Sequence, residues 1–518
     1  MLSASPRSGR GPSSAARLAV AVLAGVLTLS GCQLHGGDHP AATGTPVAQR
    51  HCAGASAFEC ITLAVPADHF TPASPTWHVT FAVHRGSVDS RGVFVIAAGG
   101  PGDSGIAEAD TDLSLMSRDI TDHNDVVLFD QRGIGLSEPF RCDHALAHDH
   151  TGVLTSASPA ADRDAFAAAA RRFSAACFAE AGVAQADAPR YATREAVEDL
   201  EAFRHWLGAD RLVLYGESYG TQFQQTYAAA HPDRVAAMVL DGVVDLTTDP
   251  LTTAGETARA YSDVLATTLA ACDAEPACAD DAPGTAESGY DQLATQLPRA
   301  PLPGGQPDSG LTLQDLQNAA DASVSDPQAR RDLQRALNAA VRGDDTALVR
   351  LAANSPPIGL ETAYDPSDAI YDAVECQDYA FLPQGTSGRR QLDVWLTTAS
   401  ATGVDQERLG GVFYGDVPCL FWPHAGGGWS PPAPVTDPPY PRLLLTADTD
   451  PNTPTQNAHR VFDRSTDNAA LVVLQGGPHV VYGRGVPCVD DAVDTLVTTG
   501  RLPSQAVTVC PGQVAAAY

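Results

Sequence analysis

The chain has 518 residues, and its 62 acidic and 32 basic side chains give it a net charge of −30 at neutral pH. Every basic residue is an arginine, which excludes a lysine Schiff base, a phosphate-loop lysine and a lysine general base. The acidic balance argues against nucleic acid as a partner, because phosphates need a basic surface. Hydrophobic residues make up 44% and charged residues 18% of the chain, a globular composition with room for about three domains.

The first 31 residues have the pattern of a signal peptide. A basic leader precedes an apolar run from Leu18 to Leu29, which is too short to span a bilayer as a helix. The segment Leu29-Ser30-Gly31-Cys32 resembles the lipobox of bacterial lipoproteins, which are cut before the cysteine and acylated on its sulfur. We therefore expect an exported protein that is anchored to the outer side of the membrane only through Cys32. An ordinary secretory signal is the alternative.

Ten cysteines follow residue 32, an even number. Oxidising surroundings favour disulfides in an exported chain, and no Cys-x-x-Cys or Cys/His cluster has the spacing of a zinc site. We therefore expect no metal and five disulfides, although many pairings are formally possible. Pairing of neighbours along the chain gives Cys52–Cys60, Cys142–Cys177, Cys272–Cys278, Cys376–Cys419 and Cys488–Cys510.

Strands and helices alternate after a polar tether over residues 32–50. Residues 77–83 alternate with the two-residue period of a half-buried strand, and residues 193–207 have helical periodicity up to Gly208. Short apolar runs are typical of strands buried on both faces of a parallel sheet. Such runs lie at residues 93–98, 126–129, 212–215, 235–240, 443–446 and 471–474. The alternation predicts an α/β fold with a mainly parallel sheet flanked by helices.

The pattern becomes helical between residues 243 and 439. Helices are predicted at 257–272, 313–322, 328–341 and 365–374, and the linkers between them are rich in proline and glycine, notably 301–310. We interpret this region as a large, mostly helical cap inserted into the α/β core. The core then consists of a first part, 51–242, and a C-terminal part, 440–518.

A motif with a serine between two glycines joins the predicted strand 212–215 to the helix that follows. Its residues are Gly216-Glu217-Ser218-Tyr219-Gly220. Small residues at both ends of the motif allow a turn sharp enough to expose Ser218 at the carboxyl end of the strand. The N-terminus of the helix stabilises negative charge nearby. This placement predicts that Ser218 is a nucleophile.

Glycines also follow the predicted strand 93–98, in the segment Gly99-Gly100-Pro101-Gly102. Glycine lets backbone N–H groups face a substrate carbonyl that becomes an oxyanion. We expect the N–H groups of Gly100 and Tyr219 to be the two donors.

A strand-turn-helix serine site needs an acid and then a histidine later in the chain. Asp450 comes just after the predicted strand 443–446, and His479 comes just after 471–474. Because the carboxyl ends of parallel strands share one edge of a sheet, these residues can converge on Ser218. Asp448 and Asp241 are the rival acids, and His231 and His459 are weaker candidates for the base because they belong to predicted helices.

Another motif, Asp130 to Ser137 (D-Q-R-G-x-G-x-S), follows the strand 126–129. Together with G-G-P-G and G-x-S-Y-G it resembles the prolyl iminopeptidase and tripeptidyl aminopeptidase group of α/β-hydrolases. The segment D-P-x-T-P that begins at Asp450, and the tail from Cys488 to Cys510, look like the tripeptidyl aminopeptidase branch. The resemblance covers about Cys52 to Cys510. The chain departs from it in having Ala98 where prolyl iminopeptidases usually have histidine, and G-P-H rather than G-H-G around His479.

The resemblance implies an exported serine aminopeptidase that releases short peptides, such as tripeptides, from free N-termini through an acyl-enzyme, without metal or organic cofactor. A carboxylate pair can recognise the α-ammonium group of such a substrate. Glu375, in an acidic segment of the cap, and Glu217, beside the nucleophile, are the candidates. Solvation of the cap surface, and for Glu217 support of the turn, are the alternative roles.

Three other functions remain open from the sequence. A secreted esterase or lipase would use the same fold and triad with an apolar acyl pocket. A serine carboxypeptidase shares the letters G-E-S-Y, but lacks D-Q-R-G-x-G-x-S in this form. A noncatalytic surface-binding lipoprotein would not need Ser218, Asp450 and His479 together.

Overall fold

The computed structural model describes residues 44–518, except for 53, 89, 143–144, 146–162, 298–301, 307–308, 355–366, 384, 424–430, 437 and 465–466. The predicted signal peptide, the predicted lipidation site Cys32 and most of the predicted tether lie outside the described residues. Within the described part of the chain, every helix is too short or too polar to cross a membrane.

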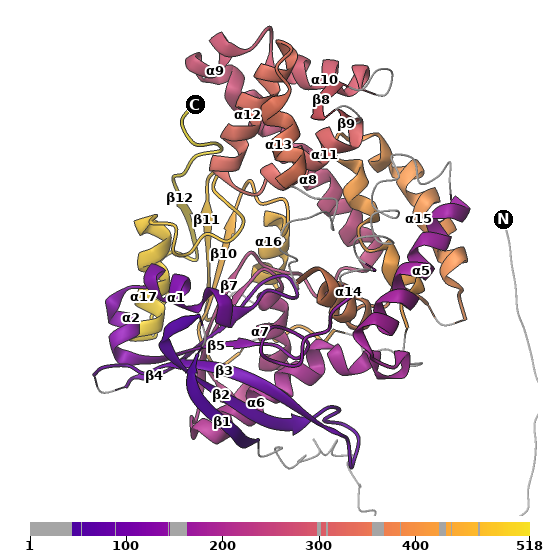
Figure 1. Cartoon of the computed structure of the whole chain (residues 1–518). Coiled ribbons are helices and arrows are strands. Elements are labelled where there is room, and N and C mark those ends of the chain that lie inside the picture. Colours follow the sequence, from indigo (N-terminus) through magenta and orange to yellow (C-terminus); the bar gives the residue numbers. More distant parts are fainter. Residues whose placement is uncertain are drawn as a thin grey trace, which may run out of the picture. The chain divides into compact units, whose positions relative to one another are not determined.

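A ten-stranded sheet lies at the centre of the described chain, in the order β1-β2-β3-β5-β4-β6-β7-β10-β11-β12 (Figure 1). The first three pairs in this order are antiparallel and the others are parallel, which confirms the predicted mainly parallel sheet. The strands are β1 (Thr45–Cys52), β2 (Ala55–Pro66), β3 (Thr76–His84), β4 (Gly92–Ala97), β5 (Asn124–Asp130), β6 (Leu212–Glu217), β7 (Val235–Asp241), β10 (Arg442–Ala447), β11 (Ala469–Leu474) and β12 (Val507–Cys510).

The central strands are buried on both faces, which is why they appear in the sequence as continuous apolar runs. All six residues of β10 and of β11 are buried. Alternate side chains enter two different hydrophobic clusters: in β4, Val95 belongs to one cluster and Phe94 to the other. The two clusters are the cores on the two faces of the sheet.

Helices cover both faces. Helices α1, α2 and α17 contribute to the cluster that contains Phe94, and α5, α6, α7 and α16 contribute to the cluster that contains Val95 (Figure 1). Their bounds are α1 (Gly105–Leu115), α2 (Arg118–His123), α5 (Arg163–Ala181), α6 (Thr193–Leu207), α7 (Tyr219–Ala230), α16 (Thr455–Asp463) and α17 (Pro487–Thr499).

The segment between β7 and β10 holds most of the remaining helices. They are α8 (Pro250–Ala274), α9 (Pro276–Asp281), α10 (Ala286–Gln296), α11 (Leu313–Ser323), α12 (Pro327–Val341), α13 (Thr346–Asn354), α14 (Ser367–Asp378) and α15 (Gly388–Thr402). Buried residues of α8 to α13 form a third hydrophobic cluster. In contrast, Ile370 of α14 and Trp395 of α15 belong to the cluster on the sheet. The insertion therefore has one part with its own core and one part that shares the core of the sheet.

Two stretches differ from the sequence prediction. Residues 45–50 of the predicted tether belong to β1, whose first seven residues are exposed and therefore lack the apolar alternation of a strand. The predicted linker 301–310 holds the hairpin of β8 (Leu302–Gln306) and β9 (Ser309–Leu311), where Pro303 occupies a strand of a two-stranded sheet. Proline is tolerated there because such strands have a free edge.

The ten cysteines after residue 32 form five disulfides, and these join the pairs that the neighbour rule predicts. They are Cys52–Cys60, Cys142–Cys177, Cys272–Cys278, Cys376–Cys419 and Cys488–Cys510.

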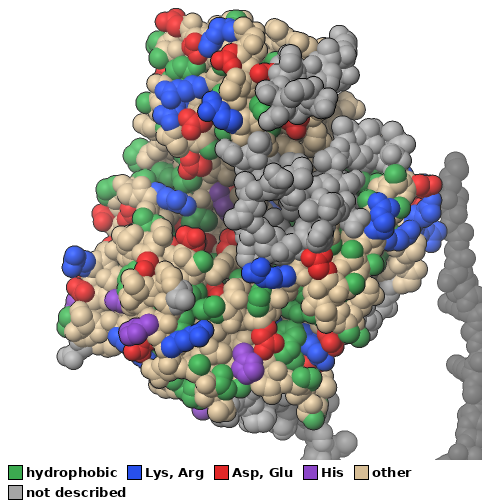
Figure 2. Space-filling view, viewed as in Figure 1, with side chains coloured by type: hydrophobic (Ala, Val, Ile, Leu, Met, Phe, Trp, Pro, Cys, Tyr) green, Lys and Arg blue, Asp and Glu red, His purple; other side chains and the backbone are tan. Residues whose placement is uncertain are grey.

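Charged side chains are spread over the face of the described residues that Figure 2 shows, with acidic and basic groups interspersed. Some of them pair: Arg408 contacts Glu287 and Asp291, and Arg342 contacts Asp281. Such exposed pairs each contribute little to stability.

Candidate active site

Ser218 lies in a strained turn between β6 and α7. Its backbone has φ 53° and ψ −119°, a conformation that side-chain-bearing residues rarely adopt. A Cβ atom on Gly216 would lie 2.3 Å from the carbonyl oxygen of Gly220, and one on Gly220 would lie 2.1 Å from that of Ala97. Glycine is therefore required at both ends of the motif, and the turn holds Ser218 at the carboxyl end of β6.

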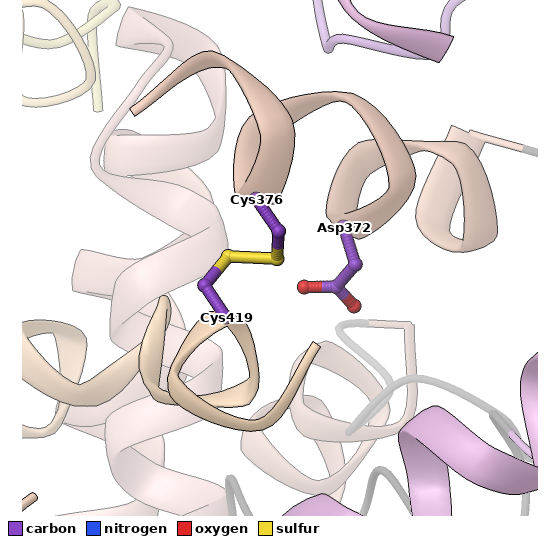
Figure 3. Close-up of side chains that lie close together, drawn as sticks. All are labelled: Asp372, Cys376 and Cys419. Carbon is purple, nitrogen blue, oxygen red and sulfur yellow. A yellow bond between two sulfur atoms is a disulfide. The ribbon is translucent and has the colours of Figure 1, made fainter. Parts of the chain in front are cut away.

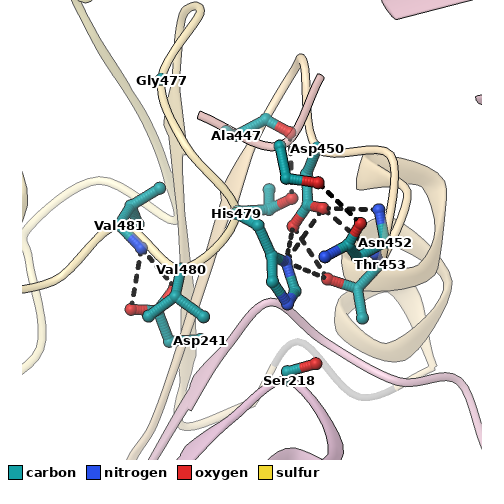
Figure 4. A network of polar contacts seen from close by, with 12 residues as sticks. Ser218, Asp241, Ala447, Asp450, Asn452, Thr453, Gly477, His479, Val480 and Val481 are labelled. Carbon is teal, nitrogen blue, oxygen red and sulfur yellow. Dashed lines mark hydrogen bonds and ion pairs between the residues drawn. The ribbon is translucent and has the colours of Figure 1, made fainter. Parts of the chain in front are cut away.

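Asp450 and His479 meet beside Ser218. Asp450 follows β10, His479 follows β11, and the imidazole Nδ1 is 3.0 and 2.9 Å from the two carboxylate oxygens. Ser218 lies on the side of the ring that faces away from Asp450 (Figure 4). The structure thus brings together the three residues that the chain order predicts as nucleophile, acid and base, in an arrangement suited to proton transfer from the serine.

Thr453 adds to the contacts of this pair. Its backbone N–H donates to one carboxylate oxygen of Asp450 at 3.1 Å, and its hydroxyl donates to the other at 2.8 Å. The hydroxyl is also 3.4 Å from Nδ1 of His479, and the N–H of Asn452 donates to Asp450 at 3.0 Å. The carboxylate is thereby held facing the imidazole.

The electrostatic setting of His479 favours a stable imidazolium. Burial by itself lowers the pKa of His479, but the charge of Asp450 and its hydrogen bond raise that pKa, and the net result lies above the ordinary value. Asp241 and Glu217 raise the pKa further. An imidazole in this setting can accept the serine proton and keep it while the carbonyl is attacked.

The two rival acids hold the loop of His479 rather than its ring. Asp448 accepts a hydrogen bond from the N–H of Gly476 at 2.6 Å. Asp241 accepts hydrogen bonds from the N–H groups of Val481 and Tyr482, at 3.0 and 2.8 Å. Acidic side chains therefore fix the loop on both sides of His479, while Asp450 contacts the imidazole itself (Figure 4).

Backbone N–H groups near Ser218 come from the two segments that the sequence predicts. Gly100 has φ +100°, and a Cβ atom there would lie 2.4 Å from the backbone nitrogen of Gly102. Tyr219 is the first residue of α7, and the first N–H groups of a helix have no partner within the helix. Gly100, Ser218 and Tyr219 line the same cavity. This geometry can stabilise an oxyanion at the scissile carbonyl.

The motif that begins at Asp130 supports the oxyanion side of the site. Asp130 accepts hydrogen bonds from the hydroxyl of Ser104 and from the N–H groups of Ile106 and Leu136, which ties the start of α1 to this loop. Gln131 accepts a hydrogen bond from the Tyr219 hydroxyl at 3.1 Å. The motif thus fixes both the loop and the side chain of Tyr219, one of the two predicted oxyanion donors.

Arg132 anchors this loop in the core. The guanidinium is fully buried, and it donates two hydrogen bonds to the carboxylate of Asp199, at 2.8 and 2.7 Å. It also donates to the carbonyl groups of Ala67 and Arg190, each at 2.8 Å. A two-pronged contact of this kind is strong and directional, so the loop has little freedom to shift.

A cavity of about 370 Å³ opens beside the nucleophile. Ser218, Gly100 and Tyr219 line it on the side of the sheet, and Glu375 of α14 and Asp416 line it on the side of the insertion. Desolvation and the charge of Asp416 raise the pKa of Glu375 well above its ordinary value. Desolvation raises the pKa of Asp416 to about 6. The two half-buried acids therefore lie together at one end of the cavity, where Asp416 carries a negative charge above about pH 6.

Glu375 is a residue that the sequence predicts for the site, but Asp416 is not. Asp416 lies outside the acid-rich segment of the cap, just before the short helix η6 (Val417–Phe421). A signal for it was present, because the predicted disulfide Cys376–Cys419 brings this helix next to α14. The other acids of that segment include Glu361 and Asp365, which lie outside the described residues.

Asp378 supports Tyr219 from the insertion. Its carboxylate accepts hydrogen bonds from the N–H and hydroxyl of Thr193 and from the amide of Gln222, and the Thr193 hydroxyl also contacts the hydroxyl of Tyr219. Desolvation raises the pKa of Asp378 to about 7. The side chain of Tyr219 is thus connected to α14 through Thr193 and Asp378. No local sequence motif predicts this connection.

Glu217 is not among the described residues that line the cavity. Desolvation, followed by the charges of Asp112 and Asp241, raises the pKa of Glu217 to about 8, so the carboxyl group is mostly protonated at neutral pH. This position agrees with the alternative of a group that supports the turn, and disagrees with a direct contact to substrate.

One group of side chains has the spacing of a metal site. Asp372, Cys376 and Cys419 lie close together, but the two sulfur atoms are bonded to each other (Figure 3). A metal ion needs thiolates as sulfur ligands, so this group cannot bind one while the disulfide is intact.

Comparisons with known proteins agree with this architecture. The family model of the alpha/beta hydrolase fold matches residues 92–485. Serine protease Hip1 of Mycobacterium tuberculosis (strain ATCC 25618 / H37Rv) is 27% identical over 461 residues, which are 86% of each chain. Tripeptidyl aminopeptidase of Streptomyces lividans is 26% identical over 492 residues, 88% of this chain and 84% of the relative.

A third relative has a different activity in its name. Carboxylesterase B of Mycobacterium tuberculosis (strain ATCC 25618 / H37Rv) is 26% identical over 474 residues, 87% of this chain and 86% of the relative. These relatives confirm the predicted resemblance. The chain belongs to the α/β-hydrolase family and is a serine hydrolase.

Proposed function

We propose that this protein is an exported aminopeptidase that releases short peptides from free N-termini. His479 takes the proton of Ser218 as the serine oxygen attacks the scissile carbonyl, and Asp450 orients the imidazole and stabilises its charged form. The N–H groups of Gly100 and Tyr219 stabilise the oxyanion. The leaving amine takes the proton from His479, and water then releases the acyl group from Ser218.

The acid pair in the cavity is the observation that carries this proposal. Glu375 and Asp416 line the same cavity as Ser218, and no arginine or histidine is among its described lining residues. A negative charge in a partly desolvated cavity attracts a cation strongly, by about 4 kcal/mol at 4 Å with an effective dielectric constant of about 20. The α-ammonium of a peptide is such a cation. An ester with an apolar acyl group gains nothing from these carboxyl groups.

Esterase activity is the second candidate, because one relative with the same coverage is named carboxylesterase. The same serine, histidine and oxyanion donors would hydrolyse an ester. The two functions differ in whether the substrate needs a free amine.

The experiment compares three substrates: a tripeptide p-nitroanilide with a free N-terminus, its N-acetylated form and a short p-nitrophenyl ester. We expect kcat/KM to be at least about 100-fold higher for the free amine than for the acetylated peptide, because the acetylated form loses charged hydrogen bonds worth about 3 kcal/mol. Ser218→Ala should abolish turnover. Equal cleavage of both peptides would contradict aminopeptidase activity, ester turnover alone would favour an esterase, and no turnover at all would favour a noncatalytic protein.

The acid pair is tested with Glu375→Gln and Asp416→Asn. Each should raise KM for the free-amine peptide about 10-fold or more and leave ester hydrolysis nearly unchanged. The exposed Glu287 of α10 provides the control Glu287→Gln, which should not affect KM. In the wild type, KM for the peptide should rise as the pH falls through about 6, because Asp416 becomes protonated and loses its charge. The ester substrate should not show this rise.

Export and lipid anchoring remain part of the proposal. The lipobox-like segment that ends at Cys32 and the five disulfides support them. Labelling of the expressed chain with a radioactive fatty acid should occur in the wild type and be absent from Cys32→Ser. Labelling of both would place the acyl group elsewhere.

A further inference from the structure

Arg330 of α12 is a fully buried arginine whose hydrogen bonds all go to neutral oxygen atoms. Its guanidinium donates to the carbonyl groups of Val324 (2.6 Å), Gly477 (2.9 Å), Val514 (2.9 Å) and Thr449 (2.6 Å), and to the hydroxyl of Thr449 (3.1 Å). Among the described residues it makes no ion pair with a carboxylate. Burial of a charge without such a partner is costly, so this arginine calls for an explanation.

The partners of Arg330 lie on both catalytic loops. Thr449 immediately precedes Asp450, and Gly477 lies two residues before His479. The hydroxyl of Thr449 also contacts the carbonyl of Gly477 at 3.2 Å. The guanidinium therefore joins the two loops at the positions where each turns toward the site.

The segment before Arg330 holds the base as well. The backbone N–H of His479 donates to the carbonyl of Ser325 at 2.8 Å, and the hydroxyl of Ser325 contacts the side chain of Asn452 at 2.9 Å. The insertion thus contacts the backbone of the catalytic histidine and the loop of the catalytic acid through residues 324–330.

The positive charge of Arg330 acts on the same groups. Burial lowers the pKa of Arg330 to about 10, and Asp326, Asp450 and Asp448 oppose that shift, so the guanidinium is charged at neutral pH. The charge of this cation interacts favourably with the carboxylate of Asp450.

The other charges that face His479 are acidic. Asp450 after β10, Asp241 at the end of β7 and Glu217 at the end of β6 all raise the pKa of His479. A further cation, Arg484, lowers the pKa values of Glu217 and Asp112. Arg330 is thus a buried cation that the insertion supplies to the two loops that carry Asp450 and His479.

We propose that Arg330 is a positioning residue of the triad, which holds the loops of Asp450 and His479 together from the insertion. The inference rests on the proposed triad and goes beyond it, because it assigns part of the catalytic geometry to the helical insertion rather than to the α/β core.

The test uses Arg330→Met, which removes charge and hydrogen bonds, and Arg330→Lys, which keeps the charge but loses the planar fork. Arg331→Met is the matched control, because Arg331 is the next residue on α12 and pairs with Asp332. Each variant is assayed with the short ester across pH, and its thermal unfolding is followed in parallel. The ester avoids any dependence on amine recognition.

We expect Arg330→Met to lower kcat about 10-fold to 100-fold with little change in KM, since positioning losses act mainly on the transition state. The acid limb of its kcat/KM profile should move to lower pH, because the contact by which Asp450 raises the pKa of His479 is weakened when the two loops are no longer joined. Arg330→Lys should lower kcat less and keep the limb near that of the wild type. A merely structural role would change the unfolding temperature but not the limb.

The inference would be overturned if Arg330→Met had the same kcat, and the same acid limb of the kcat/KM profile, as Arg331→Met. If Arg330→Met does not fold, wild-type kcat in Arg330→Lys would overturn it. Failure of the proposed triad gives a different result, because Ser218→Ala and His479→Ala would then retain activity whatever Arg330 does.

Discussion

At the scale of single residues, the site depends on side chains that hold Asp450 and His479 in place. Thr453 contacts both, through its hydroxyl at 2.8 Å from Asp450 and 3.4 Å from His479. The hydroxyl donates to the carboxylate oxygen that also contacts Nδ1 of His479, so it helps to keep the two side chains in contact.

We predict that Thr453→Val lowers kcat about 10-fold to 100-fold, because a hydrogen bond to a charged group contributes about 1.5–3 kcal/mol. KM should change little. Steady-state kinetics on the ester and the peptide check this prediction. Thr455→Val is the control: the Thr455 hydroxyl is buried without a hydrogen-bond partner among the described residues, so its loss should leave kcat unchanged. Equal effects of the two substitutions would contradict the role of Thr453.

The residues of the triad were predictable because chain order and the strand ends constrain them. Ser218, Asp450 and His479 each follow an apolar strand, and the carboxyl ends of parallel strands share one edge. Arg330 and Asp416 were not predictable in this way, because they come from the insertion and reach the site only through tertiary packing. Glu217 is next to the nucleophile in sequence but is not among the described residues that line the cavity, because successive residues of a strand alternate between its two sides.

At the scale of elements, α14 and η6 hold the acidic end of the cavity. Glu375 precedes Cys376 in α14, and Asp416 lies three residues before Cys419 in the chain. The disulfide between these cysteines (Figure 3) joins the two elements that carry Glu375 and Asp416, and so keeps these two acids close together.

We predict that the double variant Cys376→Ser/Cys419→Ser raises KM for the free-amine peptide about 10-fold or more and affects ester hydrolysis much less, since the acids are free to separate. Cys52→Ser/Cys60→Ser is the control, because that disulfide joins β1 to β2 away from the cavity residues. Both variants should unfold at lower temperature, since a disulfide contributes about 2–4 kcal/mol. A similar KM for the two variants would show that the disulfide does not hold the acids.

The strands were easier to predict than the helices around them. Continuous apolar runs, such as those of β10 and β11, indicate buried strands in a chain where strands and helices alternate. In contrast, α5 (Arg163–Ala181) is rich in alanine, and its apolar residues show no clear helical periodicity. Helix α8 begins at Pro250, seven residues before the predicted start at Thr257, because Asp249 caps it and proline suits its first position. Proline ends a helix when it lies in its interior, but it is compatible with the first position of a helix, where the cap by Asp249 sets the start of α8.

At the scale of the whole molecule, some of the acidic side chains that outnumber the basic ones are buried in the interior. Burial raises the pKa of Asp378 to about 7, and the pKa values of Asp416 and Glu375 are also raised. Their pKa values in the unfolded chain are lower, so the folded chain binds protons more tightly. Stability therefore increases as the pH falls through the raised pKa values, and decreases as these groups ionise at higher pH.

We predict that the unfolding temperature rises when the pH is lowered from about 8 to about 5.5, and that added salt raises it at the higher pH by screening the net charge of −30. Thermal unfolding followed by circular dichroism checks both. Asp378→Asn should flatten the pH dependence, since it removes one of the groups with a raised pKa. An unfolding temperature that falls over this pH range would contradict the prediction.

The five disulfides occur one after another along the chain, and no cysteine of one pair lies between the two cysteines of another. The largest separation is 43 residues, between Cys376 and Cys419. As the chain emerges from N-terminus to C-terminus, each new second cysteine therefore meets its correct partner as the nearest free thiol. If oxidation follows the order of emergence, it gives these five pairs without exchange between wrong pairs.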